Sequence, residues 1–360
     1  MKRIFVAVLG LLVLCSGASA QNDYVYTDAG SLPLYGKLCD DTFEPFSRLP
    51  LSMKDSVRDA VWRLGRSSAG LFVRFTSDAG KFDFRWESVF RTNLTNMAPV
   101  GVRGLALYVL DNGRWMFVAS QRPDADKSES SSKVTASRLA GTQREYMLYL
   151  SLYDGVRNLR IGVPPGCRVK PSAMDSPRSA NPIVIYGTSI LQGASASHPG
   201  MCGTAQLSRR TDRVVINLGF SGNCRLEEPI ARYMASYPDP GMYIIDNWNG
   251  PASVAEKGLE KCLRILRAAH PAVPVLVVDR PLKPIALFDD ESASLLEARS
   301  GVAASVVAKM QKEGDGNIFH LSPSVLGEGN SGTIDGTHFT DEAFTRWVDA
   351  ICPYVMEYLK

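Results

Sequence analysis

The chain has 360 residues, of which 45% are hydrophobic and 21% are charged, as is typical of a globular protein with room for two domains. Its formal net charge is +3, and no basic run occurs beyond the first three residues. A nucleic-acid-binding protein needs a clustered cationic face, so the sequence does not favour nucleic acid as a partner.

The N-terminus resembles a bacterial signal peptide. Two basic residues precede an apolar run, residues 4–14, that is too short for a stable membrane anchor. Ala18-Ser19-Ala20 is an A-x-A cleavage signal, so residues 1–20 are expected to be removed. Cys15 offers lipid attachment as the alternative, but a leucine precedes it where a small residue is usual. We expect a secreted or periplasmic protein without membrane insertion.

Residues 21–170 are predicted to form an all-β domain. Residues 71–75 and 82–86 alternate apolar and polar side chains with the period of a half-buried strand. Asp111-Asn112-Gly113 separates two further apolar runs and is a hairpin-turn signal. Short strands with frequent turns indicate a β-sandwich.

Residues 171–182 are rich in Pro, Ser and Ala and are predicted to be a linker, after which residues 183–360 form a second domain. Its apolar strands are predicted at 183–186, 214–218, 242–245, 273–278 and, more weakly, 318–319, and its helices at 255–269, 292–311 and 341–358. Apolar strands alternating with helices predict a parallel α/β sheet covered on both faces. The functional site of such a sheet lies at the carboxyl ends of its strands.

Six of the seven cysteines lie beyond the leader, and no C-x-x-C pair occurs among them. A zinc site or a thioredoxin-like site is therefore not predicted. An oxidising compartment would allow some of these cysteines to pair, in a connectivity that the sequence does not choose. The alternative is that most are small buried apolar residues.

Gly187-Thr188-Ser189 follows the first strand of the second domain. The glycine allows a sharp turn, and a serine that attacks an ester needs exposure, a base and donors for the oxyanion. The motif is not the G-x-S-x-G elbow of α/β-hydrolases, because residue 191 is leucine. Alone, a small polar residue at such a turn is more often a helix N-cap.

Three further motifs follow later strands or precede the last helix. Asn217-Leu218-Gly219-Phe220-Ser221-Gly222 follows the second strand, where its glycines allow an N–H to face a bound oxygen. Asn247 and Asn249 follow the third strand, and either side-chain amide is a candidate oxyanion donor. Each of these motifs is also an ordinary turn signal.

Asp335-Gly336-Thr337-His338 precedes the final helix. A carboxylate three residues before an imidazole can orient it, while the other ring nitrogen faces a nucleophile. A lone motif of this kind is more often a helix cap beside a surface histidine. The order and placement of the four motifs, and their match to one reaction, make the set specific.

Together the four motifs resemble the blocks of the SGNH/GDSL hydrolase superfamily. Residues 186–201 are similar to a bacterial subgroup with an N-terminal β-sandwich of the GxDLY type, and residues 46–50 and 102–108 resemble the signatures of that sandwich. The resemblance covers nearly the whole mature chain. It implies a flavodoxin-like domain with a five-stranded parallel sheet, and no metal or organic cofactor.

Carried over by position, the resemblance implies Ser189 as the nucleophile, His338 as the base and Asp335 as the residue that orients it. It implies N–H groups of Ser189 and Gly222, and the Asn249 side chain, as the oxyanion hole. The third block lacks the usual G-x-N-D form, so Asn247 is a rival to Asn249.

The resemblance and the leader favour an exported carboxylic-ester hydrolase acting on short acyl esters, O-acetyl groups on carbohydrate in particular. Trp248 and Arg280 are candidate substrate contacts, with a core or rim aromatic and a surface ion pair as the alternatives. One rival is a lipase or thioesterase, which needs an extended apolar lid that the sequence around the blocks does not show. Another is a carbohydrate-binding protein with a vestigial hydrolase domain, against which the intact Ser, His and Asp argue.

Overall fold

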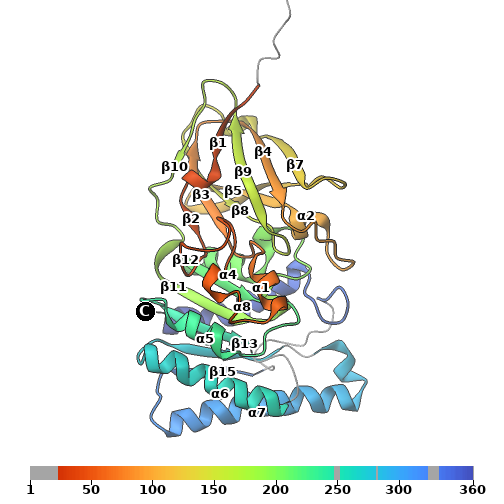
Figure 1. The fold of residues 1–360 in the computed structure, drawn as a ribbon, viewed down its shortest axis with the longest axis vertical. Helices are drawn as coiled ribbons and strands as arrows, with labels where there is room; N and C mark the ends of the chain where they lie inside the picture. The colour runs from red at the N-terminus through yellow and green to blue at the C-terminus, as the bar shows by residue number, and fades with distance from the viewer. Residues whose placement is uncertain (1–22, 247–251, 281–282, 323–331, 360) are drawn as a thin grey trace, which may run out of the picture.

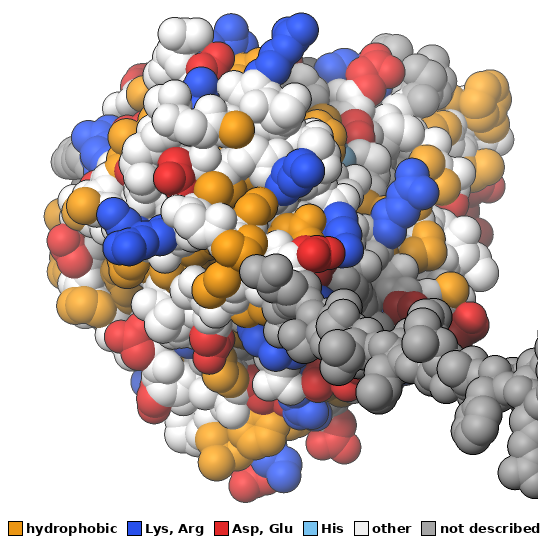
Figure 2. Space-filling view, turned by 90° about the horizontal axis from the view of Figure 1, so that it is seen from above, with side chains coloured by type: hydrophobic (Ala, Val, Ile, Leu, Met, Phe, Trp, Pro, Cys, Tyr) orange, Lys and Arg blue, Asp and Glu red, His pale blue; other side chains and the backbone are white. Residues whose placement is uncertain are grey.

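The computed structural model describes residues 23–246, 252–280, 283–322 and 332–359. The predicted leader at residues 1–20 lies outside these ranges. Within them, no helix has both the length and the apolar character needed to cross a membrane. On the face seen in Figure 2, Lys and Arg side chains lie interspersed with acidic and apolar ones.

The N-terminal part is a β-sandwich of two antiparallel sheets, shown in the upper half of Figure 1. One sheet has the order β1-β9-β4-β7, and the other has the order β10-β3-β8-β5-β6 with β2 paired to β3. The strands are β1 (Val25–Asp28), β2 (Leu34–Tyr35), β3 (Phe72–Ser77), β4 (Lys81–Ser88), β5 (Leu105–Asp111), β6 (Arg114–Gln121), β7 (Glu129–Thr135), β8 (Arg144–Tyr149), β9 (Val156–Val163) and β10 (Val169–Pro171). Inward-facing aromatic rings of the two sheets pack together, for example Phe82 against Phe75 and Tyr146.

The predicted hairpin turn connects β5 to β6. Asn112 and Gly113 both have positive φ values, 47° and 74°, which match the twist of two paired strands. Two short helices, α1 (Asp59–Gly65) and α2 (Pro99–Arg103), lie at the end of the sandwich that faces the second domain (Figure 1).

The second domain is built on a five-stranded parallel sheet of order β12-β11-β13-β14-β15, which is the predicted flavodoxin-like order. Its strands are β11 (Arg178–Gly187), β12 (Arg213–Gly219), β13 (Met242–Asp246), β14 (Val275–Val278) and β15 (Ile318–Leu321). Its helices are α3 (Ser189–Gln192), α4 (Gly203–Thr211), α5 (Glu228–Ala235), α6 (Ala252–Ala269), α7 (Asp290–Lys312) and α8 (Asp341–Tyr358). β11 begins inside the segment expected to be a linker, because Arg178 pairs with Arg213 of β12.

One hydrophobic core is shared by the two domains, and a second lies inside the sandwich. A single cluster of buried side chains includes Phe72 and Tyr149 of the sandwich together with Ile183 and Tyr186 of β11. Gly70 marks how close the backbones come, since a Cβ atom there would lie 2.5 Å from the Cβ of Asn217. The sandwich and the α/β domain therefore fold against each other as one packed body.

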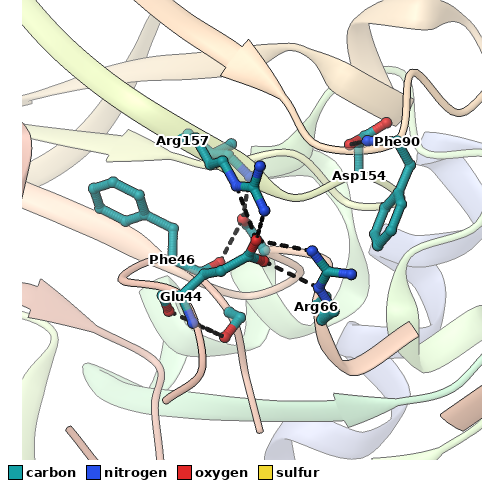
Figure 3. A network of polar contacts seen from close by, with 9 residues as sticks. Glu44, Phe46, Arg66, Phe90, Asp154 and Arg157 are labelled. Carbon is teal, nitrogen blue, oxygen red and sulfur yellow. Dashed lines mark hydrogen bonds and ion pairs between the residues drawn. The ribbon is translucent and has the colours of Figure 1, made fainter. Parts of the chain in front are cut away.

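An ion-pair network joins three segments of the sandwich domain near α1, as Figure 3 shows. The carboxylate of Glu44 accepts hydrogen bonds from the guanidinium groups of Arg66 and Arg157. Burial acts to raise the pKa of Glu44, but these two arginines outweigh it, and the pKa lies below its usual value. Glu44 therefore stays ionised and links α1 to β9.

None of the six cysteines in the described part of the chain forms a disulfide. Cys202, Cys224 and Cys262 are buried. These three pack as small apolar residues, whereas the alternative interpretation expected most of the six to be buried.

Candidate active site

Ser189 lies where β11 ends and α3 begins, at the carboxyl edge of the sheet. The turn requires Gly187, because an added Cβ atom would lie 2.4 Å from Leu191 and 2.6 Å from the carboxylate of Asp246. Thr188 donates to that same carboxylate oxygen through both its N–H and its hydroxyl, at 2.8 Å each. The turn that carries Ser189 is therefore held by close packing at Gly187 and by the hydrogen bonds from Thr188 to Asp246.

The structure brings together the three side chains predicted to react. The Ser189 hydroxyl lies 2.9 Å from Nε2 of His338, and Nδ1 of His338 lies 2.7 Å from Oδ2 of Asp335. An ionised carboxylate only accepts, so Nδ1 carries the ring proton of a neutral imidazole and Nε2 is left to accept from the serine. This arrangement suits removal of the serine proton.

Asp335 is held in its ionised form. Its other oxygen, Oδ1, accepts from the backbone N–H groups of Thr337 and His338 at 3.1 and 2.9 Å. Partial burial acts to raise the pKa of Asp335, but hydrogen bonds from the ring and backbone of His338 and from Asn96 outweigh it, so the pKa lies well below its usual value. The carboxylate therefore stays charged throughout the neutral range.

Asn96 extends this arrangement into the sandwich domain, and no sequence motif pointed to this residue. It lies between β4 and α2, and its Nδ2 is 3.0 Å from Oδ2 of Asp335 and 3.2 Å from Nδ1 of His338. The atom facing the carboxylate must be the amide nitrogen, because two acceptors would repel each other. The backbone carbonyl of Asn96 accepts separately from the Ser195 hydroxyl at 2.8 Å.

The loop after β12 lies directly beside the helix that carries Ser189. A Cβ atom on Gly219 would meet the backbone nitrogen of Gln192 at 2.3 Å, and the side-chain oxygen of Gln192 accepts from the N–H of Ser221 at 2.8 Å. Gly222 follows with a φ of 65°, in the left-handed region that favours glycine. The predicted oxyanion donor Gly222 is thus on a loop tied to α3.

Two buried side chains shape that loop. Asn217 accepts from the N–H of Gly219 at 2.8 Å and donates to the carbonyl of Leu191 at 2.7 Å. Arg48 reaches in from the sandwich and donates to the carbonyls of Asn217 and Gly219 at 2.9 and 2.8 Å. Arg48 belongs to one of the segments that resembled the sandwich signatures, and the structure gives that segment a physical role.

The remaining predicted residues divide into two groups. Asn247, Trp248 and Asn249 lie outside the described residues. Arg280 follows β14 and is largely buried, which lowers its pKa, and it lies close enough to Asp246 and Asp335 to interact with their charges. Among the residues that the structure describes, no three His, Cys, Asp or Glu side chains gather as a metal site.

Comparisons with known proteins cover both domains. A model of the N-terminus of SGNH-hydrolase-type esterases, named GxDLY, matches residues 24–169. The model of the GDSL-like lipase/acylhydrolase family matches residues 180–356. A search of curated proteins gives no significant match.

Solved structures share this fold over most of the chain. A protein described as a GDSL-like lipase from Bacteroides ovatus has 29% identity and a TM-score of 0.87, over 93% of this chain and 98% of its own. The salicylyl-acyltransferase SsfX3 of a tetracycline pathway has 13% identity and a TM-score of 0.73, over 94% and 100%. A family two carbohydrate esterase from Clostridium thermocellum, in complex with cellohexaose, has 12% identity and a TM-score of 0.56, over 80% and 92%.

The two family models and the Bacteroides structure together span both domains. The chain belongs to the SGNH/GDSL hydrolases, carboxylic-ester hydrolases, in the form that carries a GxDLY domain before the catalytic one.

Proposed function

We propose that this chain is an exported serine esterase that removes short acyl groups, acetyl above all, from carbohydrate. The observation that carries the proposal is the continuous hydrogen-bonded chain from Ser189 through His338 to Asp335. The likeness to a fold used by a carbohydrate esterase supports the choice of carbohydrate by analogy.

The proposed reaction proceeds in two steps. His338 takes the Ser189 proton as the hydroxyl attacks the ester carbonyl, and Asp335 stabilises the imidazolium that forms. The N–H groups of Ser189 and Gly222, with the Asn249 amide, stabilise the oxyanion. His338 then protonates the leaving alcohol, and water repeats the sequence to release the acid.

The test uses a fluorophosphonate probe and 4-nitrophenyl esters. Wild type should be labelled at Ser189 and should hydrolyse the acetate, while Ser189→Ala should lose both properties. Ser236→Ala, at the end of α5, is the matched control and should keep both. Labelling at another serine, or equal activity of wild type and Ser189→Ala, would exclude Ser189 as the nucleophile.

The acyl preference separates this proposal from the lipase alternative. Comparison of 4-nitrophenyl acetate with the octanoate should favour the acetate. A preference for chains of eight carbons or more would contradict the short-acyl proposal. Equal glycan binding by wild type and Ser189→Ala, with negligible hydrolysis by both, would instead support the carbohydrate-binding alternative.

Export is proposed from the N-terminal sequence alone. When the full chain is expressed in a bacterium, the protein should appear in the periplasm or medium with its N-terminus near Gln21. A protein that stays in the cytoplasm with residues 1–20 still attached would contradict the proposed export.

A further inference from the structure

A pocket of about 560 Å³ lies between the sandwich and the catalytic domain. Its walls include Arg63 of α1, the loop residues 90–94 that follow β4, Tyr153, and Ser221 and Asn223 of the loop after β12. This volume is within the range of small-molecule binding sites. Both domains therefore contribute to one candidate ligand site.

Three of these walls lead directly to the proposed catalytic groups. The Tyr153 hydroxyl is 3.4 Å from the carbonyl oxygen of Ser189. Ser221 and Asn223 flank Gly222, the predicted oxyanion donor. Residues 90–94 continue to Asn96, whose amide donates to Asp335. The pocket therefore borders the segments that carry the catalytic groups, although Ser189 and His338 themselves do not line it.

Hydrogen bonds support the sandwich wall of the pocket, where Figure 3 shows Asp154 next to Phe90. The buried Asp154 carboxylate accepts from the N–H groups of Phe90 and Thr92 at 2.8 and 2.6 Å. The Arg63 and Arg66 guanidinium groups lie over the Phe90 ring, 5.2 and 4.9 Å from its centroid. The pocket is therefore formed before any ligand arrives.

The charge of the pocket is positive. Its lining includes Arg63 and Arg91 but neither Asp nor Glu. No ion pair joins Arg63 or Arg91 to a carboxylate in the described part of the chain. Arg280 and Lys283 do not line this pocket, but both interact electrostatically with Asp335. A guanidinium group binds a carboxylate through two parallel hydrogen bonds, which makes arginine suited to this ligand.

We infer that this pocket binds the alcohol portion of an anionic substrate, namely a carbohydrate ester that carries a carboxylate, as in a uronic acid. Arg63 and Arg91 bind the sugar carboxylate, and the ester is directed towards Ser189. The lining combines apolar residues, among them Leu64 and Phe90, with polar ones such as Asn93, whose amide can hydrogen-bond to sugar hydroxyl groups. This inference rests on the proposed esterase function.

The experiment compares O-acetylated galacturonic acid with its O-acetylated methyl ester, which differs only in the charge of the sugar. The measured quantity is the ratio of the two kcat/KM values. Wild type should prefer the anionic substrate by about ten-fold or more, and Arg63→Gln/Arg91→Gln should lower this preference by about ten-fold, mainly through KM. Arg63→Lys/Arg91→Lys keeps the charge and should retain part of the preference.

Arg138→Gln is the matched control, because this exposed arginine lies in the turn Ser137–Leu139 near the start of β4, whereas the pocket loop follows its end. It should leave the ratio unchanged. An equal rate on both sugars in wild type, or an unchanged ratio in the Gln double variant, would overturn the inference.

Hydrolysis of 4-nitrophenyl acetate separates the two possible failures. If Ser189-dependent hydrolysis of this ester persists while the sugar ratio is one, the anionic-substrate inference alone is wrong. If wild type cleaves none of the three esters, the esterase proposal fails and the inference falls with it.

Discussion

Replacing Asn96 with leucine tests whether the sandwich domain takes part in the chemistry. The Asn96 amide donates to Oδ2 of Asp335, the same oxygen that accepts from the His338 ring. Leucine has nearly the same volume but no donor, so the packing between the domains is kept while this hydrogen bond is lost. Asp335 retains its other partners, the ring and two backbone N–H groups.

The magnitude follows from the exposure of this hydrogen bond. A hydrogen bond to a charged group contributes about 1.5–3 kcal/mol. The Asp335 side chain is 36% exposed, so water replaces part of the lost donor and the lower end of that range applies. Because Asp335 and the His338 ring are then less firmly oriented towards Ser189, we expect kcat/KM at the pH optimum to fall by about ten-fold, compared with about 10⁴-fold for losing the function of a triad carboxylate.

A change in pH dependence distinguishes a positioning role from a packing role. Without the Asn96 donor, the charge on Asp335 is less neutralised and stabilises the imidazolium form of His338 more strongly. The acid limb of kcat/KM, which reports protonation of the base in the free enzyme, should therefore move to higher pH. Asn96→Asp places a second carboxylate beside the pair and should move the limb further.

The assay is hydrolysis of 4-nitrophenyl acetate over the whole pH range in which the protein stays folded, with thermal unfolding measured for each variant. Ser195→Ala is the matched control, since it removes the hydrogen bond to the Asn96 carbonyl without removing the donor to Asp335. It should leave the acid limb in place. An unmoved acid limb in both Asn96 variants would refute the positioning role and leave Asn96 as an ordinary interface residue.

Two further predictions concern stability. Arg48→Met should destabilise the protein by about 3–5 kcal/mol in urea unfolding, because a buried cation is removed and the buried carbonyls of Asn217 and Gly219 lose its hydrogen bonds. A loss below about 1 kcal/mol would contradict this. The second prediction concerns His198, whose pKa is lowered by burial from 6.5 to about 4. Between about pH 4 and pH 6.5 this side chain is therefore neutral in the folded protein and takes up a proton when the protein unfolds. Stability should therefore fall as the pH drops from about 6.5 to about 4, and His198→Gln should flatten that decrease; equal pH dependence in both proteins would contradict the assignment.

The sequence predicts well what depends on neighbouring residues. Alternating side chains locate β3 and β4, and continuous apolar runs locate β11 to β14, because strand burial leaves a local pattern. Ser189 and His338 are found in the same way, since each belongs to a short motif at the end of a strand or before a helix. The pairing of β11 from Arg178 onwards is missed, because it depends on a contact with Arg213.

The contacts that complete the site are long-range and leave no such pattern. Asn96 and Asp335 are separated by 239 residues, and an asparagine in a loop has no feature that distinguishes it from a turn residue. The role of Asp246 in fixing Thr188 is hidden for the same reason, since it depends on the pairing of two strands. The reacting residues are therefore easier to identify from the sequence than the residues that position them.

These positioning contacts change how the sandwich domain should be understood. A domain attached only to bind glycan would be expected to meet its neighbour through a small polar interface. Here a hydrophobic core extends across the junction between the domains. Arg48 supports the loop that precedes Gly222, and Asn96 donates to the carboxylate of Asp335. Loss of the sandwich would remove a buried cation, a charged hydrogen bond and one wall of the pocket together. The sandwich is therefore a structural part of the active site. Substitutions where it meets the catalytic domain, such as those of Arg48 and Asn96, should reduce catalysis more than they reduce glycan binding at any other surface.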